Sequence, residues 1–303
     1  MSQISVLQEW SQARSSLSAS LAPRAVSIVC GKHRAISGFH WRPDLIVTAA
    51  EALGGDEEVG VLSAAGEQRA RVLACDLTTD VAVLQVPGSA EPASASVSST
   101  PLQAGAGVVF VGRSRGGPLV SFGSVRLAGP AWSSRRGGTI DQRLEFEGQL
   151  DVRFEGALVA DFAGAAQAML VAGPRGSLLG IPSATIERIA SVVEQRGYLP
   201  RPYLGLRLQH LWLDEATRTR WGRARRTVAA VAGVESGSPA ERAGLAPGDL
   251  IEALDGAPVA DIEALAARLA GASPGRTLAL LRRRGGQTES IAIEVGEWRP
   301  AKA

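Results

Sequence analysis

The sequence predicts a mostly β protein of about two domains, in which many short strands are followed by a smaller region that mixes strands and helices. Three observations predict this organisation. The chain has 303 residues, which is enough for two separate cores. Residues 25–181 read as short β-branched and aliphatic runs separated by Gly, Pro, Asp and Ser, a pattern typical of barrels or a sandwich. After Pro200 and Pro202, strand-like runs alternate with two short helical segments.

Seven runs between residues 24 and 171 have the composition of strands. A closing helix is expected over residues 183–196, because apolar residues recur there at helical spacing between a possible N-cap, Ser183, and the terminating Gly197. We therefore divide the chain into an N-terminal segment (1–24), a β domain (25–199) and a second domain (200–303). The predicted strands are 24–30, 45–48, 59–62, 71–73, 81–86, 108–111 and 168–171.

The first 24 residues predict a separate N-terminal helix. Its apolar residues fall near one helical face that ends before Pro23. Glu9 and Arg14 interrupt any continuous apolar stretch of the kind found in secretory signals, so we expect a cytoplasmic protein. The residues on the apolar face are Ile4, Leu7, Trp10, Leu17 and Leu21.

Composition argues against several classes of partner. Apolar residues make up 45% of the chain and charged residues 20%, with a formal net charge of +2. This weak charge gives no reason to expect binding to nucleic acid or to an anionic membrane. Cys30 and Cys75 are far apart and lack the spacing of a zinc site, so we expect no metal and no other cofactor. No segment approaches the length of a membrane span.

The most specific pattern lies at residues 237–259. Gly237 to Ile251 reads GSPAERAGLAPGDLI, and residues 254–259 read LDGAPV. Ser238 caps a short predicted helix over 239–243, and a second helix is expected over 261–269. This pattern resembles the PDZ domain of the bacterial HtrA/Deg family. The preceding domain resembles the trypsin-like protease domain of the same family at residues 37–48, 79–84 and 178–183. The resemblance implies a chymotrypsin/trypsin-like double β-barrel followed by an α+β PDZ domain.

The resemblance places the family's catalytic triad at Glu51, Asp80 and Phe154. A serine protease needs a hydroxyl nucleophile, an imidazole base and a carboxylate that orients the base. Only the carboxylate, Asp80, is present, because Glu51 replaces the histidine and Phe154 replaces the serine. Shifting the alignment by one residue puts Glu155 at the serine position, and no Ser, Thr or Cys occurs from 141 through 171. We therefore expect no intact catalytic site.

The resemblance also implies a peptide-binding site in the second domain. Tyr203, Leu204, Gly205 and Leu206 match the loop that presents backbone N–H groups to a ligand's terminal carboxylate. The ligand would add as a strand along residues 206–208. Leu265 and Leu269, four residues apart, either line this groove or fill the core.

Three charged features complete the site analysis. The carboxylates of Glu51 and Asp80 need a basic partner if they lie close together, and we expect Arg153 to supply it; a metal ion is the alternative. The arginine-rich residues 218–226 are expected to form a solvated or partner-facing loop. Residues 282–284, three arginines, are expected to be an exposed hairpin tip.

These observations favour an HtrA-like pseudoprotease, a scaffold or regulatory subunit in protein quality control. It would bind C-terminal or extended peptides, including the C-termini of unfolded proteins. The family implies a trimer, as a homo- or hetero-oligomer, with an active HtrA-like paralogue as a possible partner. It also makes the periplasm the alternative to the cytoplasm. The alternative functions are an active serine endopeptidase with a rebuilt or partner-completed site, and a chaperone that does not cleave.

Overall fold

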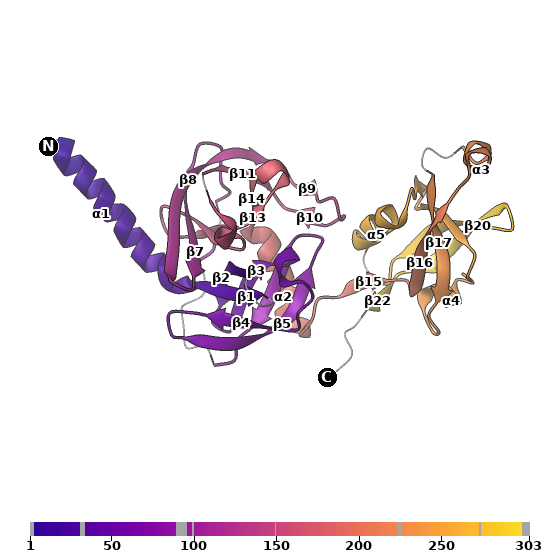
Figure 1. Cartoon of the computed structure of the whole chain (residues 1–303), viewed down its shortest axis with the longest axis horizontal. Helices are drawn as coiled ribbons and strands as arrows, with labels where there is room; N and C mark the ends of the chain where they lie inside the picture. Colours follow the sequence, from indigo (N-terminus) through magenta and orange to yellow (C-terminus); the bar gives the residue numbers. More distant parts are fainter. Residues whose placement is uncertain are drawn as a thin grey trace. The chain divides into compact units, whose positions relative to one another are not determined.

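The computed structural model describes residues 3–30, 34–88, 96–98, 100–148, 150–222, 226–272 and 274–298 (Figure 1). The chain divides into two compact units. The first comprises Met1–Trp132 and Thr139–Leu199, and the second comprises Ser133–Gly138 and Pro200–Ala303.

The first half of the first unit is a closed antiparallel barrel with the strand order β1-β2-β3-β6-β5-β4. Its interior is filled by branched and aromatic side chains such as Ile28, Phe39 and Ile46, none of which is exposed. The strands that carry these residues are buried along nearly their whole length, so both of their faces are covered. The strands are β1 (Ala25–Cys30), β2 (Arg34–Arg42), β3 (Leu45–Ala49), β4 (Glu58–Leu62), β5 (Glu67–Asp76) and β6 (Val81–Gln85).

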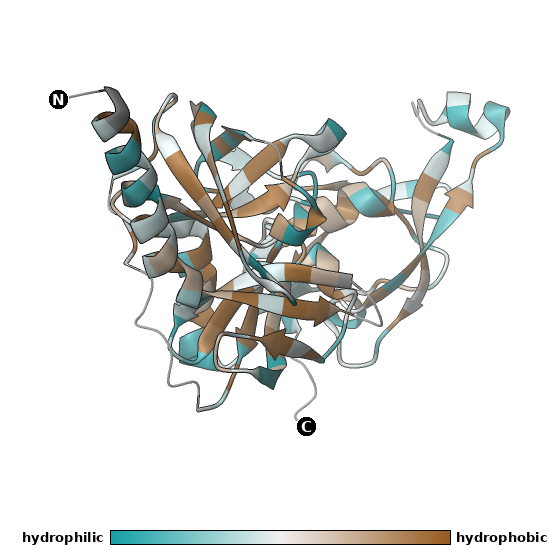
Figure 2. Cartoon of the chain, turned by 60° about the vertical axis from the view of Figure 1, so that its left-hand side comes forward, coloured by the Kyte–Doolittle hydropathy of each residue, from teal (hydrophilic) through white to brown (hydrophobic). Residues whose placement is uncertain are grey.

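A second closed barrel follows, with the strand order β11-β14-β13-β12-β7-β8. Hydrophobic residues concentrate on the strands of both barrels (Figure 2). The prediction of a mostly β, double-barrel first domain is therefore confirmed. The strands are β7 (Gly107–Ser114), β8 (Gly117–Gly129), β11 (Arg143–Glu147), β12 (Leu158–Asp161), β13 (Ala166–Ala172) and β14 (Leu178–Pro182), with the small pair β9 (Trp132–Ser133) and β10 (Thr139–Ile140) between β8 and β11.

Two helices flank this unit. α1 (Gln3–Leu21) precedes the first barrel, and α2 (Ser183–Arg196) follows β14 and ends at Gly197, whose φ is 77°. α2 buries Ile186, Ile189 and Val193, the apolar face that the periodicity predicts. No helix within the described ranges is both long and apolar enough to cross a membrane.

The second unit is a sheet of order β16-β17-β18-β20-β21, with β19 (Ala257–Pro258) paired to β18. One face carries a core that includes Leu204, Val231 and Leu265, and the other carries a smaller cluster around Leu213 and Val228. The predicted PDZ-like fold is confirmed. Its elements are β15 (Arg201–Tyr203), β16 (Leu206–Trp212), α3 (Glu215–Arg220), β17 (Thr227–Val234), α4 (Pro239–Arg242), β18 (Leu250–Leu254), α5 (Ile262–Ala270), β20 (Thr277–Arg284), β21 (Gln287–Glu294) and β22 (Gly296–Trp298).

The segment expected as a solvated loop at residues 218–226 is only partly a loop. Asp214 caps a short helix, α3, by accepting a hydrogen bond from the N–H of Thr217 (2.7 Å). Arg283 lies over the ring of Trp221, with the guanidinium carbon 4.6 Å from the ring centroid. Arg223 and Arg225 lie outside the described residues. Side-chain capping and this aromatic contact give the segment a structure that its polar composition did not indicate.

Candidate functional site

Asp80 and Glu51, two of the three residues predicted at the triad positions, lie beside each other. Glu51 begins a short helical turn after β3, and Asp80 immediately precedes β6, which pairs with β3. The Asp80 Oδ1 accepts a hydrogen bond from the backbone N–H of Glu51 (2.8 Å). Asp80 has a φ of 61°, a left-handed conformation that Asp tolerates better than most residues. Its carboxylate therefore stabilises the backbone at Glu51, whose own side chain is exposed.

Phe154, the residue predicted at the third triad position, is part of the core of the second barrel. Its side chain is 7% exposed and belongs to a cluster with Val108, Phe110 and Leu170. An apolar ring of this size favours burial over contact with a carboxylate and solvent. The structure therefore gives this side chain a packing role, which its position in the family motif alone did not indicate.

The turn that carries Phe154 uses its own backbone donors. The N–H of Phe154 donates to the carbonyl of Asp151 (3.0 Å), and that of Glu155 donates to the carbonyl of Val152 (3.2 Å). The N–H of Arg153 donates to the carboxylate of Asp151 (2.8 Å). Backbone N–H groups of an oxyanion hole must instead point at the reacting carbonyl oxygen. In this conformation the turn directs these three N–H groups at its own residues.

The same turn packs closely against β2. Ser37 donates its N–H to the carbonyl of Glu155 (2.8 Å) and its hydroxyl to the carbonyl of Arg153 (2.6 Å). Gly156 has a φ of 79°, and a Cβ atom at this position would lie 2.3 Å from the Ser37 carbonyl oxygen. Only glycine permits this approach. Glu155, the alternative residue for the serine position, accepts a hydrogen bond from the N–H of Ala172 (2.9 Å).

The prediction that Arg153 neutralises Glu51 and Asp80 is wrong. Its guanidinium pairs with Asp151, with Nε donating to Oδ1 at 2.9 Å. This hydrogen bond, with the charge of Arg153, lowers the pKa of Asp151. A partner two residues away in the same turn is reached without ordering another segment, so the local pair forms. Among the described residues, no group of three His, Cys, Asp or Glu side chains is arranged to hold a metal ion.

The loop matched to carboxylate binding joins β15 to β16 in the second unit. The carbonyl of Leu204 accepts a hydrogen bond from the N–H of Ala240, and the carbonyl of Gly205 accepts one from the N–H of Glu235, both at 2.9 Å. Tyr203 donates its hydroxyl to the carboxylate of Glu235, which raises the pKa of Tyr203. Within the part of the chain that the structure describes, the N–H groups of Leu204 and Gly205 donate to no protein acceptor. The loop is thus held in place through its carbonyl groups.

Position 205 requires a glycine, because there is no space for a side chain. Its φ is 77°, and a Cβ atom would lie 2.2 Å from the Cβ of Ser238 and 2.9 Å from the Tyr203 hydroxyl. Moving Ser238 away would cost stability, because this residue is buried and caps α4. Its hydroxyl accepts a hydrogen bond from the N–H of Glu241 (3.2 Å). The close approach therefore explains the glycine in this loop.

β16, which follows the loop, is an edge strand of its sheet and pairs only with β17 among the described strands. α5 contacts β15, β16 and β17. Leu265 of α5 is 2% exposed and belongs to the core, whereas Leu269 is only partly buried. Of the two leucines, Leu265 is therefore a core residue, whereas Leu269 packs against the core and keeps part of its surface exposed.

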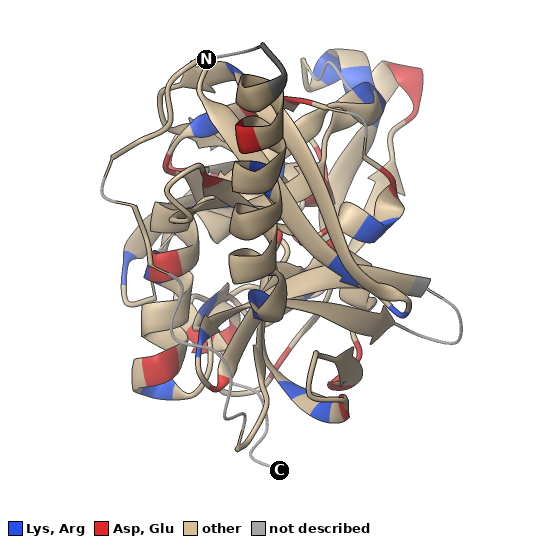
Figure 3. Cartoon of the chain, turned by 90° about the vertical axis from the view of Figure 1, so that its left-hand side faces the viewer, with Lys and Arg blue, Asp and Glu red and all other residues tan. Residues whose placement is uncertain are grey.

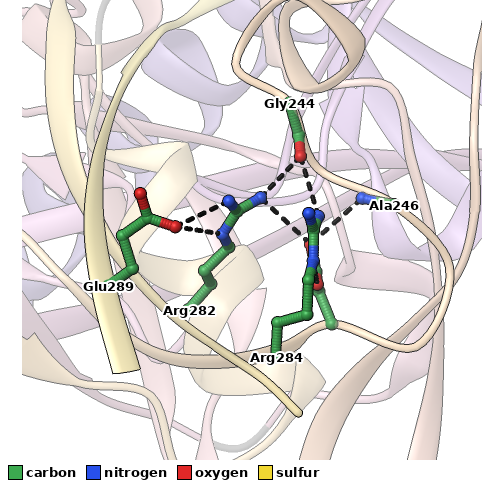
Figure 4. A network of polar contacts seen from close by, with 6 residues as sticks. Gly244, Ala246, Arg282, Arg284 and Glu289 are labelled. Atoms are coloured by element: carbon green, nitrogen blue, oxygen red, sulfur yellow. Dashed lines mark hydrogen bonds and ion pairs between the residues drawn. The ribbon is translucent and has the colours of Figure 1, made fainter. Parts of the chain in front are cut away.

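Arginines expected at an exposed hairpin tip form a polar network instead (Figure 4). Arg284 donates to both carboxylate oxygens of the buried Asp249, at 2.6 and 2.8 Å. Arg282, which is 9% exposed, donates to Glu289 (2.7 Å) and to the carbonyl of Gly244. The expectation of exposure holds for Arg284 but is wrong for Arg282 and Arg283, because β20 lies next to β18 and the turn at residues 244–249. The network joins that turn to β20.

Two family models match the chain. Residues 36–169 match the trypsin-like peptidase domain, and residues 230–283 match the PDZ domain. Together with the fold, these matches define a trypsin-like protease homologue with a PDZ domain.

Relatives and solved structures extend this result. The chain is 32% identical to a probable periplasmic serine endoprotease, DegP-like, of Rhizobium meliloti over 41% of this chain and 24% of that protein. It is 27% identical to the putative serine protease HhoA of Synechocystis over 84% of this chain and 68% of that protein. The fold is similar to that of the Yersinia pestis serine endoprotease (TM-score 0.60, 20% identity, 94% and 98% of the two chains covered). It is equally similar to that of the HtrA-type protease AlgW with decapeptide (TM-score 0.59, 21% identity, 94% and 99% covered).

These comparisons show a trypsin-like peptidase domain followed by a PDZ domain, with a fold similar to that of HtrA-type proteases. The match spans about a quarter of the DegP-like relative's length. The expectation of a cytoplasmic location has no support from that relative, whose name describes it as periplasmic.

Proposed function

We propose that this protein is a non-cleaving HtrA-like pseudoprotease that binds the C-termini of peptides or unfolded proteins through its PDZ domain. The observation that carries the proposal is the combination of a buried Phe154 with an Asp80 whose carboxylate accepts the backbone N–H of Glu51. Neither a hydroxyl nor an imidazole stands at these three positions, so the general-base activation of a serine has no participants there.

The histidines elsewhere support the same proposal. His40 lies on β2, paired with Ile46, and is 2% exposed. His210 belongs to the second unit, on β16. His33 lies outside the described residues. A general base must come within hydrogen-bond reach of its nucleophile, and an exposed cleft histidine is the usual form of that base.

The peptide-binding half rests on the loop before β16. Its carbonyls are tied to Glu235 and Ala240, and the N–H groups of Leu204 and Gly205 are left for a carboxylate. β16 offers an edge along which a peptide can add as a strand, which supplies main-chain hydrogen bonds without selecting a particular sequence.

Cleavage is tested with purified full-length protein, unfolded casein and a fluorophosphonate probe. We expect no loss of intact casein and no labelled serine, with an active trypsin-like protease as the positive control. Labelling of a serine in this chain, together with casein fragments, would show the alternative function, an active endopeptidase with a rebuilt site. Cleavage only after adding a relative from the same cell would indicate a site completed by a partner.

Peptide binding is tested with the Gly205→Ala variant. A library of peptides with random C-terminal residues is passed over the immobilised protein, and the retained peptides are sequenced. We expect the wild type to enrich particular C-terminal residues and the variant to lose at least about tenfold in retention, because the added methyl group displaces the loop from Ser238. Gly222→Ala, at a positive-φ glycine with open space around it, is the matched control.

Assembly and partners follow from the same assignment. We propose a homo- or hetero-oligomer, a trimer by analogy with the family, in which an active HtrA-like paralogue is the candidate second subunit. Co-purification from the native cell identifies that subunit. Retention of the native protein in a periplasmic or a cytoplasmic fraction tests its compartment in the same preparation.

A further inference from the structure

One face of β16 carries a row of side chains that extends well beyond the loop. Paired residues of neighbouring strands share a face, and the partners of Leu208 and His210 on β17 are Val231 and Ala229, both in the core beneath α5. Because strand side chains alternate, Leu206 and Trp212 lie on this same face. The row is therefore Leu206, Leu208, His210 and Trp212.

The third member of the row meets α5. His210 Nε2 lies 3.5 Å from Glu263 Oε1 in the first turn of α5, and their side chains are 42% and 75% exposed. The contact joins the edge strand to the helix at the position that a ligand strand would occupy. Glu263 thus places a solvent-accessible carboxylate beside the ligand's path.

The fourth member of the row is an exposed aromatic residue. Trp212 is 73% exposed, the highest value among the large hydrophobic residues of the described chain, and it stands at the end of β16. A large apolar side chain exposed beside an unpaired strand edge offers binding area to an extended ligand.

Strand geometry relates these residues to positions in the ligand. This step rests on the proposed function, in which the ligand's carboxylate binds at Leu204 and Gly205 and its last residue lies opposite Leu206. An antiparallel ligand strand then places the fourth residue before the last opposite His210, and the sixth opposite Trp212. Both side chains fall on the row's face, because directly paired residues share a face.

We infer that His210, Glu263 and Trp212 form a second recognition subsite for extended C-terminal peptides. The subsite takes a basic side chain at the fourth residue before the last and an apolar one at the sixth. The Glu263 carboxylate attracts a lysine or arginine and repels a glutamate or aspartate, while Trp212 covers an apolar side chain. The protein therefore selects ligands over about seven residues rather than over the last three.

The experiment uses the same peptide library with full-length wild type, Glu263→Gln and Trp212→Ala. We expect the wild type to retain peptides with Lys or Arg at the fourth residue before the last about twofold to fivefold over those with Asp or Glu, a range typical of exposed charge pairs. Glu263→Gln reduces this ratio to about one. Trp212→Ala removes the preference at the sixth position only.

Two variants are matched controls. Glu294→Gln removes another exposed carboxylate, on β21 at the opposite edge of the sheet, and Trp298→Ala removes another exposed tryptophan, on β22. Both leave the charge and apolar preferences unchanged. Circular dichroism confirms that all variants are folded.

The outcomes separate this inference from the proposed function. Suppose that retention is selective and depends on Gly205, but the ratio of basic to acidic peptides is the same in wild type and Glu263→Gln. This result overturns the subsite and leaves the proposed function standing. If the wild type shows no selective retention at any position of the peptide, both the subsite and the proposed function are overturned. Loss of the charge preference in Glu294→Gln as strongly as in Glu263→Gln also overturns the subsite, because it indicates an overall charge effect.

Discussion

At the scale of single residues, Asp80 has a role that does not depend on catalysis. Its carboxylate accepts the N–H of Glu51 at 2.8 Å, and its backbone adopts a φ of 61°. The hydrogen bond fixes the start of the turn after β3. The Asp80 carboxylate is therefore explained by the backbone that it holds, whichever side chain stands at position 51.

We expect Asp80→Ala to lower the free energy of unfolding by about 2 kcal/mol, since it removes a hydrogen bond to a charged group and puts alanine in a left-handed conformation. Asp80→Asn should cost less than half of this, because an amide oxygen can still accept the N–H and asparagine tolerates positive φ. Urea unfolding followed by circular dichroism measures both. Equal losses in the two variants would contradict the capping role.

Phe154 shows which features of the candidate site the sequence predicts and which it does not. The motif around residues 152–159 predicted that phenylalanine replaces the serine, which is a statement about chemistry. That its ring fills the second barrel beside Phe110 depends on contacts between residues distant in sequence. In the same way, the pairing of Arg153 with Asp151 depends on the turn over residues 151–154, which the sequence alone does not predict.

At the scale of elements, sequence periodicity predicts where strands and helices lie better than it predicts which side chains of different elements contact one another. The apolar spacing of α2 and the capping pattern of α4 and α5 gave helices close to their observed bounds. The arginines of β20 were misjudged because their partners lie on the turn at residues 244–249 and on β21. Local patterns predict elements, whereas side-chain partners depend on which strands become adjacent.

The Asp249–Arg284 pair gives the turn before β18 a pH dependence (Figure 4). Burial by itself raises the pKa of Asp249, but hydrogen bonds from Arg284 and the N–H of Ala246, with the charges of Arg284 and Arg282, outweigh it and lower the pKa. A carboxyl whose pKa is lower in the folded state stabilises the fold above its unfolded pKa, near 3.9. That stabilisation is lost as the pH falls through the folded pKa.

We expect Asp249→Asn to lower the free energy of unfolding of the second unit by about 2 kcal/mol at pH 7, because Arg284 loses its charged partner. The difference between variant and wild type should shrink steadily below about pH 4, where the wild-type carboxyl becomes protonated. Urea unfolding at a series of pH values measures it. Asp255→Asn, which removes an exposed pair with Arg276, is the control and should show a loss under about 1 kcal/mol. A difference that stays constant down to pH 2 would contradict the assignment.

At the scale of the whole molecule, the chain carries separate cores. The clusters of the two barrels draw on residues between Leu21 and Val193, and those of the second unit on residues between Leu204 and Val295. Each unit therefore has a hydrophobic core of its own.

α1 carries a candidate surface for the proposed oligomer. It is poor in charge, with only Glu9 and Arg14 among its residues (Figure 3). Leu7 and Trp10 are 68% and 50% exposed, and Trp10 lies 6.1 Å, centroid to centroid, from the ring of Phe162, which is itself 47% exposed. An apolar patch of this kind on a charge-poor helix favours association with another protein surface.

We expect wild-type protein to sediment as an oligomer, and the double variant Leu7→Glu, Trp10→Glu to sediment as a monomer, because two charges would have to be buried in the interface. Gln8→Glu, which adds a charge to an exposed neighbour on the same helix, should leave the oligomer intact. Sedimentation velocity at several concentrations measures the three proteins, and circular dichroism checks their folding. A wild type that is monomeric at all concentrations, or a double variant that keeps the wild-type mass, would show that this patch is not the surface through which the subunits associate.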